Sequence, residues 1–220
     1  LASEFPGWNP YHYVHNNPLK YTDPTGMSAN DIIIQAKKGE EHIATKTFAH
    51  LQSLTTQKLE MESKGYVTFA TSGEGNKGAT EEGTNLVAAL INDKSKIVTI
   101  TNDLSNTDIK PSSLESTSIA SPHSSENAIN GIGTNTTIYF SPSVVGEFKN
   151  TEGGTSKAHA NRVLAHELIH ADHNRTGSNA RKYEPTGEQF PSTREEQNTV
   201  MRENKMFKTQ RFDGQNGKQK

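Results

Sequence analysis

The sequence predicts an α+β fold in which a small antiparallel sheet lies beside two helices that carry the candidate functional residues. Segments 65–69 and 96–101 are rich in β-branched and aromatic residues, which is typical of strands. Other segments space their apolar residues by threes and fours, which is typical of helices. One such helix contains two histidines four residues apart, and a later helix contains several glutamates. The candidate chemistry is therefore expected between these two helices.

The first 27 residues differ in composition from the rest, because they contain four prolines and five aromatic residues. The order Asn-Pro-Tyr-His-Tyr-Val-His-Asn-Asn-Pro at 9–18, followed by Asp-Pro-Thr-Gly at 23–26, closely resembles the end of the Rhs-repeat-associated core domain. In that family a shell of β-repeats ends at this signature and a variable C-terminal toxin follows. The resemblance implies that residues 1–27 end such a core and that 28–220 form the toxin domain.

The next hundred residues or so are expected to alternate between helices and strands. Segment 29–64 is predicted to be helical because its apolar residues mostly lie three and four apart, with Gly39 dividing it into two helices. Strands are predicted at 65–69 and 96–101. A short helix at 85–91 is expected to lie between them.

The middle of the chain is polar. Residues 102–136 are dominated by Ser, Thr, Asn and Gly, so they are predicted to form a loop. Residues 136–140 are β-branched and aromatic, which predicts another strand. A helix is predicted over 155–175, because a Thr-Ser pair can cap its start and Gly177 follows its end.

A final helix is predicted from the Ser192-Thr193 pair to about Phe207. The tail from about residue 209 to Lys220 is rich in Gln, Lys and Gly, and it is expected to be frayed.

Composition narrows the possible functions. The 220 residues have room for one sizeable core, and 23 basic against 25 acidic residues give a net charge of −2. That charge offers no general attraction for nucleic acid, so no nucleic-acid partner is expected. There is no cysteine, so a metal would have to be held by His, Asp or Glu. No apolar run approaches the ~20 residues that span a bilayer, so no membrane span is expected.

The sequence His166-Glu167-Leu168-Ile169-His170 carries the clearest chemical signal. Residues four apart stand on one face of a helix, so both imidazoles can bind one ion while Glu167 borders the same site. Leu164 and Leu168 lie on the opposite side, where they can anchor the helix in the core. The pattern predicts a zinc site with His166 and His170 as ligands.

The third ligand is sought further along the chain. A histidine six residues beyond His170 would indicate a metzincin, but Thr176 occupies that position. Asp172 is too close along the helix, and Asp213 lies in the expected tail. Glutamates at 195–196 on the final helix are well placed instead, which is similar to the gluzincin arrangement.

His-Glu-Leu-Ile-His followed by Glu-Glu-x-x-Thr-Val and Glu203-Asn204 resembles the NleD-type effector metallopeptidases and, more distantly, clostridial neurotoxin light chains. The similarity is confined to about 155–208. It implies a zincin-like fold, with His166, His170 and one of the two glutamates as Zn²⁺ ligands and Glu167 as catalytic base.

Helix geometry addresses the choice between Glu195 and Glu196. With Ser192 as N-cap, Glu195 would complete a capping box and turn back to the backbone, which leaves Glu196 as the expected ligand. Glu196 also shares a helix face with Glu203, which could then orient a histidine. The competing register, with Thr193 as N-cap, reverses the assignment and stays open at this point.

Zinc with three protein ligands keeps one position for water and lowers the pKa of that water to about 7. Glu167 would accept the proton and pass it to the departing amine. A second electrophile is expected from one of four residues, among which the sequence does not choose: Tyr183, Arg194, Arg202 and His173. An edge strand at 137–140 could receive the substrate as an added strand, although it could equally be an ordinary core strand.

These observations predict a zinc-dependent endopeptidase that cleaves a protein substrate as the C-terminal toxin of an Rhs-family protein. The Rhs resemblance implies secretion or delivery from a bacterium into a target cell, attachment to the parent shell, and a cognate immunity protein. Two alternatives remain: a metal-dependent nuclease toxin, and a non-catalytic module in which zinc serves stability. Purified protein offered labelled protein and DNA, with and without a chelator, separates the three.

Overall fold

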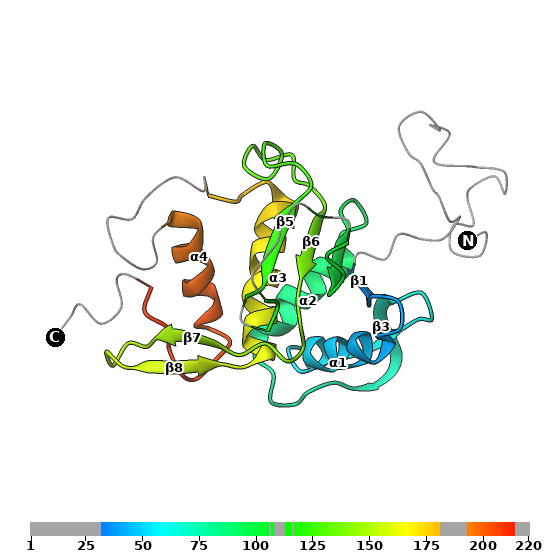
Figure 1. The fold of residues 1–220 in the computed structure, drawn as a ribbon, viewed down its shortest axis with the longest axis horizontal. Coiled ribbons are helices and arrows are strands. Elements are labelled where there is room, and N and C mark those ends of the chain that lie inside the picture. The colour runs from blue at the N-terminus through cyan, green and yellow to red at the C-terminus, as the bar shows by residue number, and fades with distance from the viewer. Residues whose placement is uncertain (1–31, 106, 108–112, 116, 181–192, 214–220) are drawn as a thin grey trace.

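The computed structural model describes residues 32–105, 107, 113–115, 117–180 and 193–213. The segment that resembles the Rhs core, and the predicted boundary after residue 27, lie outside the described residues. Within those residues the fold is α+β, as the sequence predicts (Figure 1). No helix of the described part is both long and apolar enough to cross a membrane.

A six-stranded mixed sheet forms one layer. Its strands are β1 (Ile32–Gln35), β2 (Gln57–Met61), β3 (Tyr66–Glu74), β4 (Val98–Thr101), β5 (Ile119–Pro122) and β6 (Thr136–Tyr139). The order across the sheet is β2-β3-β1-β4-β6-β5. The central pairs β1–β4 and β4–β6 are parallel, and the outer pairs are antiparallel. β5 is therefore an edge strand, and β6 lies inside the sheet.

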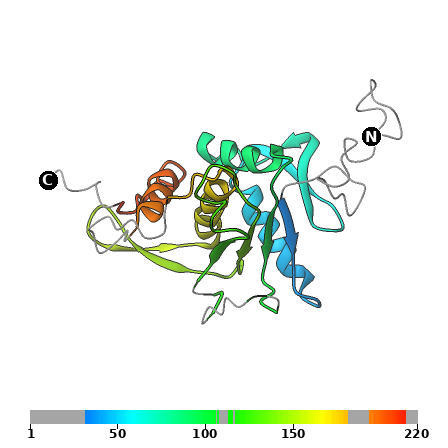
Figure 2. The same ribbon diagram turned by 90° about the horizontal axis from the view of Figure 1, so that it is seen from above.

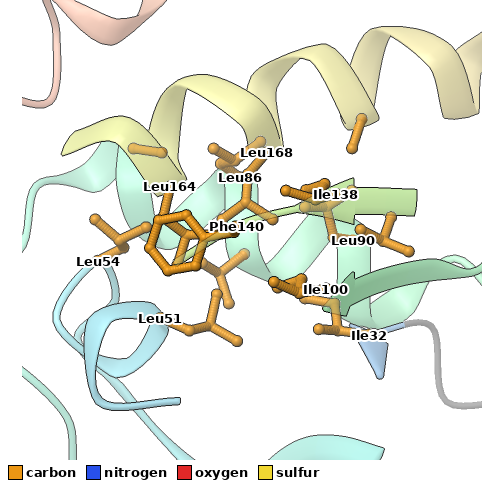
Figure 3. Packing of buried hydrophobic residues seen from close by; sticks show 14 of the residues in the cluster. Ile32, Leu51, Leu54, Leu86, Leu90, Ile100, Ile138, Phe140, Leu164 and Leu168 are labelled. Atoms are coloured by element: carbon orange, nitrogen blue, oxygen red, sulfur yellow. The ribbon is translucent and has the colours of Figure 1, made fainter. Parts of the chain in front are cut away.

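Three helices cover one face of this sheet: α1 (Glu41–Gln52), α2 (Glu81–Asn92) and α3 (Ala160–Thr176). Alternate strand residues are buried, as expected when one sheet face packs on a core and the other does not. A single hydrophobic cluster joins the layers. Figure 3 shows Leu51 of α1, Leu86 of α2 and Leu164 of α3 around Ile100 and Ile138 of the sheet.

A second unit lies beside α3. It consists of the two-stranded antiparallel sheet β7 (Gly146–Lys149) and β8 (Thr155–Ala158) together with helix α4 (Arg194–Glu203) (Figures 1 and 2). The chain after α4 returns to this hairpin, where Phe212 donates its backbone N–H to the carbonyl of Lys149 at 2.8 Å. In this unit α4 lies against α3. The hairpin lies near the N-terminal end of α3 and the C-terminal end of α4.

Three predicted strands are confirmed, at 65–69, 96–101 and 136–140, and the predicted helix at 85–91 is confirmed as part of the longer α2. The predicted helix at 29–64 is largely wrong, because only α1 is helical there and β1 and β2 flank it. Three consecutive isoleucines at 32–34 favour a strand through their β-branched side chains, and this preference outweighs the helical spacing.

The later corrections concern short polar strands. The predicted loop at 102–136 contains β5, and the predicted helix start at 155–156 belongs to β8. Each of these strands gains its backbone hydrogen bonds from a partner elsewhere in the chain, which composition does not reveal. The main sheet is mixed, so the small antiparallel sheet that is present is the β7–β8 pair. The strand at 137–140 is not an edge, because β4 and β5 flank it.

We expect a chain that begins at residue 28 to fold with a cooperative thermal transition, because it keeps every residue of the hydrophobic cluster. The comparison is the melting curve of the full chain against that of the shortened chain, each loaded with zinc. An aggregated or non-cooperative product would show that the first 27 residues contribute to this core.

Candidate metal centre

Helix α3 presents two histidines on the side opposite its core face. Leu164 and Leu168 are fully buried in the hydrophobic cluster, which fixes the rotation of the helix. The helix ends at Gly177, whose φ of 71° is the left-handed conformation that glycine adopts without strain. A side chain at Gly177 would also collide with the backbone of Gly131 at 2.6 Å. A residue other than glycine at 177 would therefore displace either the end of α3 or the segment at Gly131.

Helix α4 faces those histidines with three glutamates. Its N-cap is Thr193, whose hydroxyl accepts a hydrogen bond from the backbone N–H of Glu196 at 3.2 Å. The predicted cap Ser192 lies outside the described residues, and the predicted end at Phe207 is wrong because the helix ends at Glu203. The predicted capping-box contact of Glu195 with Ser192 therefore also lies outside the described residues. The carboxylate of Glu195 accepts from the backbone N–H of Ala180 and contacts α3.

His166, His170 and Glu196 come together as one group of possible ligands. The two Nε2 atoms are 3.2 Å apart, and the Glu196 oxygens lie 3.4 Å from Nε2 of His166 and 3.5 Å from Nε2 of His170. In a tetrahedral site with metal–ligand bonds of about 2.0–2.1 Å, neighbouring ligand atoms are about 3.3–3.4 Å apart. The two Nε2 atoms and the Glu196 carboxylate, which turns one oxygen toward each histidine, are therefore close to the spacing of a tetrahedral metal site.

The opposite ring nitrogens support the same conclusion. Nδ1 of His166 lies 2.8 Å from Glu203, and Nδ1 of His170 lies 2.8 Å from Glu195. In the neutral imidazoles each Nδ1–H donates to its carboxylate, so both Nε2 atoms carry lone pairs that face each other. Such an arrangement is repulsive unless a proton or a metal ion lies between them. Metal-binding histidines are commonly oriented by carboxylates in this way.

A second group of possible ligands consists of His170, His173 and Glu195. Here Glu195 lies only 2.8 Å from His170 and 2.7 Å from His173, which are hydrogen-bond distances. The atom that His170 would contribute is the Nδ1 that already donates to Glu195. We therefore assign Glu195 as a carboxylate that orients two imidazoles, and Glu196 as the ligand candidate.

The carboxylates also set the protonation of the histidines in the metal-free protein. Burial would lower the pKa of His166, but Glu196 and then Glu203 outweigh it and raise that pKa to about 10. Burial is likewise outweighed at His170, where Glu195 and Glu196 raise the pKa to about 9. Hydrogen bonds from His170 and His173 overcome the effect of burial on Glu195 and lower its pKa to about 2.

We expect the metal-free protein to lose stability as the pH rises from 6.5 to 10. The folded pKa values of both histidines lie above the ordinary histidine value of 6.5, so their contribution is complete below pH 6.5 and is lost as the pH passes about 9 to 10. Zinc must displace the same protons, so its stabilising effect should grow over this range. Melting temperatures with and without zinc across this range test both trends.

Glu196→Gln is the control for that experiment, because Glu196 contributes most to the raised pKa of His166. The fall in metal-free stability should be smaller in this variant. A melting temperature that rises with pH in the metal-free wild type would contradict the proposed charge arrangement.

Two arginines at the site were missed by sequence reasoning. Arg211 lies 3.2 Å from Glu196 and 3.3 Å from Glu203. Arg162, one helical turn before His166, pairs with Glu203 through Nε. Arg162 lies four residues before His166 in the sequence, so helical spacing alone could have placed it near the site. Arg211 lay in the expected frayed tail, and nothing local indicated that it returns to the site.

Three of the four residues predicted as second electrophile are described, and each contacts a carboxylate or amide side chain. Arg202 pairs with Glu82 and Asp172 instead. Arg194 donates to Gln197 within its own helix, and His173 contacts Glu195. The fourth residue, Tyr183, lies outside the described residues. Arg211 is the cation that the structure brings to the ligand candidates.

A cleft of about 200 Å³ opens beside His166. Glu167 is buried within α3 and lines this cleft next to His166, so a group bound there would meet both residues. The β7–β8 hairpin forms the facing wall, and the residues just before β5 close one end. The lining residues are Thr117, Ser118, Val144, Gly146, Glu147, Phe148, Ala158, Arg162, Val163, His166, Glu167, Glu203 and Arg211.

Comparison with known proteins identifies no relative, because no protein-family model, curated protein or solved structure matches the chain.

Proposed function

We propose that this chain is a zinc-dependent endopeptidase that cleaves a protein substrate. The observation that carries the proposal is the spacing of Nε2 of His166, Nε2 of His170 and the Glu196 carboxylate, 3.2 to 3.5 Å apart, with Glu167 beside them in an open cleft. Three protein ligands at tetrahedral spacing leave one position open, as in catalytic rather than structural zinc sites.

The donor set supports zinc as the metal. Two imidazole nitrogens and one carboxylate are a common ligand set of zinc hydrolases, and the described chain has no thiolate to offer. When bound, zinc would make water more acidic and polarise a carbonyl group.

The protein side chains supply the proton transfers and the orientation. Glu167 accepts a proton from the attacking water and delivers it to the nitrogen of the departing amine. Glu203 and Glu195 hold the rings of His166 and His170 by accepting their Nδ1–H bonds. Arg211, beside Glu196, is the candidate for stabilising negative charge that develops on the carbonyl oxygen.

An extended substrate has a natural place at β5. This strand is the edge of the sheet, so its outer backbone groups are available to pair with a peptide, and the residues just before it line the cleft. We therefore assign to β5 the pairing with substrate that the sequence suggested for 137–140. Pairing along this edge would lead a peptide past His166 and Glu167.

The biological setting rests on residues 1–27 alone. Their resemblance to the end of an Rhs core supports a toxin that is delivered from a bacterium into a target cell, and it supports a cognate immunity protein. Neither the shape of the metal centre nor its chemistry bears on this part of the proposal.

The deciding experiment offers purified protein both labelled protein and labelled DNA pools, with zinc and with a chelator. Chelator-sensitive appearance of new peptide termini, absent from a Glu167→Gln control, supports the endopeptidase. Cleavage of DNA would establish the nuclease alternative. Zinc-dependent stability without cleavage of either pool would indicate a structural metal.

A further inference from the structure

Two hydrogen-bond donors in the cleft are buried without a partner among the residues that the structure describes: Nη2 of Arg162 and Oγ of Ser118. A buried donor that lacks an acceptor is destabilising and uncommon in folded proteins. The two donors come from α3 and from the segment before β5. Arg162 and Ser118 both line the same cleft, so an acceptor group that enters it comes next to both residues.

The Arg162 side chain is held in place by several contacts. It is only 7% exposed, its Nε pairs with Glu203, and its Nη1 donates to the carbonyl of Thr209 at 2.7 Å. The guanidinium lies 4.1 Å from the ring centre of Phe148 and 5.0 Å from that of Phe207. Nε and Nη1 thus each have an acceptor, whereas Nη2 has none among the described residues. Nη2 is therefore preorganised to bind an acceptor.

The charges around the cleft favour a singly charged acceptor. Arg162, Arg211 and a bound divalent cation together balance four carboxylates, those of Glu147, Glu167, Glu196 and Glu203. A loaded site that is close to neutral accepts one negative charge more readily than two. One N–H and one hydroxyl also match the two oxygens of a single carboxylate.

We propose that this cleft binds a carboxylate of the substrate peptide close to the scissile bond, held by Nη2 of Arg162 and Oγ of Ser118. The inference rests on the proposed peptidase function and adds the substrate class, namely peptides that carry an acidic group. Arg162 precedes the ligand candidate His166 by four residues, about one helical turn or 5–6 Å along α3. A residue adjacent to the scissile bond can span that distance with its side chain.

The test measures binding separately from cleavage. Zinc-loaded full chain carrying Glu167→Gln is titrated with fluorescent heptapeptide pools that are otherwise free of acids. Three pools have amidated C-termini and contain Asp, Asn or phosphoserine at one position. A fourth pool contains Asn and ends in a free carboxylate. Cleavage of the Asp and Asn pools is then followed with the unmodified chain.

Two substitutions, each added to the Glu167→Gln chain, probe the donors. Arg162→Lys keeps the positive charge but removes Nη2, and Ser118→Ala removes only the hydroxyl. Ser143→Ala, at an exposed serine outside the cleft, is the matched control. Melting curves and bound zinc establish that each protein is folded, and Ser118→Ala provides a second test where Arg162→Lys is unstable.

We expect the Asp pool to bind at least about tenfold more tightly than the Asn pool, which corresponds to one charge-assisted hydrogen bond. Ser118→Ala and Arg162→Lys should reduce this ratio severalfold, whereas Ser143→Ala should preserve it. Tighter binding of the fourth pool than of the amidated Asn pool would support a carboxylate site and identify the peptide C-terminus as the carboxylate that it binds.

Equal binding of the Asp and Asn pools, or an unchanged ratio in folded Ser118→Ala and Arg162→Lys, would overturn the inference. Tighter binding of the phosphoserine pool than of the Asp pool would overturn the proposed carboxylate and identify a phosphate as the group that the cleft binds. Selective binding without cleavage contradicts the peptidase proposal alone, and cleavage without acidic preference contradicts this inference alone.

Discussion

Glu167→Gln should abolish peptide cleavage while leaving the fold and the bound zinc intact. Gln has nearly the size of Glu, so the packing of this buried position in α3 is preserved. Glu167 is not among the three residues at tetrahedral spacing, so the metal should remain. The amide cannot accept the proton of the attacking water, and the loss of general acid–base catalysis costs about 10²–10⁴-fold in rate.

The measurement compares turnover on any peptide that the wild type cleaves with zinc content per chain. Glu152→Gln, at an exposed position of the β7–β8 hairpin, is the matched control and should behave as wild type in both. Cleavage by Glu167→Gln at the wild-type rate would exclude the mechanism. Loss of zinc from the variant would show that this carboxylate is a ligand and not the base.

Replacing Glu196 by Ala should weaken zinc binding far more than replacing Glu195 by Ala. Glu196 completes the group whose atoms are spaced for a tetrahedron, whereas Glu195 lies at hydrogen-bond distance from the histidine rings. Loss of a carboxylate that only orients a ligand typically reduces metal affinity about 10–100-fold. Loss of the ligand itself should exceed that range.

A zinc-competition titration with a chromogenic chelator gives the dissociation constants of both variants. Glu203→Gln should resemble Glu195→Ala, because Glu203 orients His166 as Glu195 orients His170. A weaker zinc complex for Glu195→Ala than for Glu196→Ala would reverse the assignment and make the second group, with His173, the metal site.

Local patterns in the sequence were sufficient for those elements whose residue composition is distinctive. The strands at 65–69, 96–101 and 136–140 are strongly β-branched, and the His166–His170 spacing needs only one turn of helix. By contrast, β5 and the β7–β8 pair are short and polar, and their hydrogen bonds depend on partners that only the tertiary structure provides.

The reasoning about α4 shows how a local rule can mislead. Ser192 and Thr193 are both good N-caps, and the sequence favoured the first, whereas Thr193 caps the helix. That register was expected to make Glu195 the ligand, yet Glu196 faces the Nε2 atoms. Neighbouring residues differ by about 100° around a helix. Here both directions meet α3, and the two carboxylates reach opposite nitrogens of one imidazole.

Arg162 and Arg211 are the residues of the site that the sequence did not predict. Their positions depend on Glu203, which lies 41 residues from Arg162 in the chain, and on the return of the segment after α4 to the β7–β8 hairpin. Such long-range pairing leaves no periodic trace in one sequence.

The ion pairs of Arg202 have a consequence for how the chain can vary in length. They tie the C-terminal half of α4 to Glu82 of α2 and Asp172 of α3, while Glu196, six residues earlier, faces the histidines. One residue inserted or deleted between 196 and 202 would rotate Glu196 by about 100° relative to Arg202. The helix could then keep either the ion pairs of Arg202 or the position of Glu196, but not both. The seven residues from 196 to 202 are therefore expected to form a segment of fixed length.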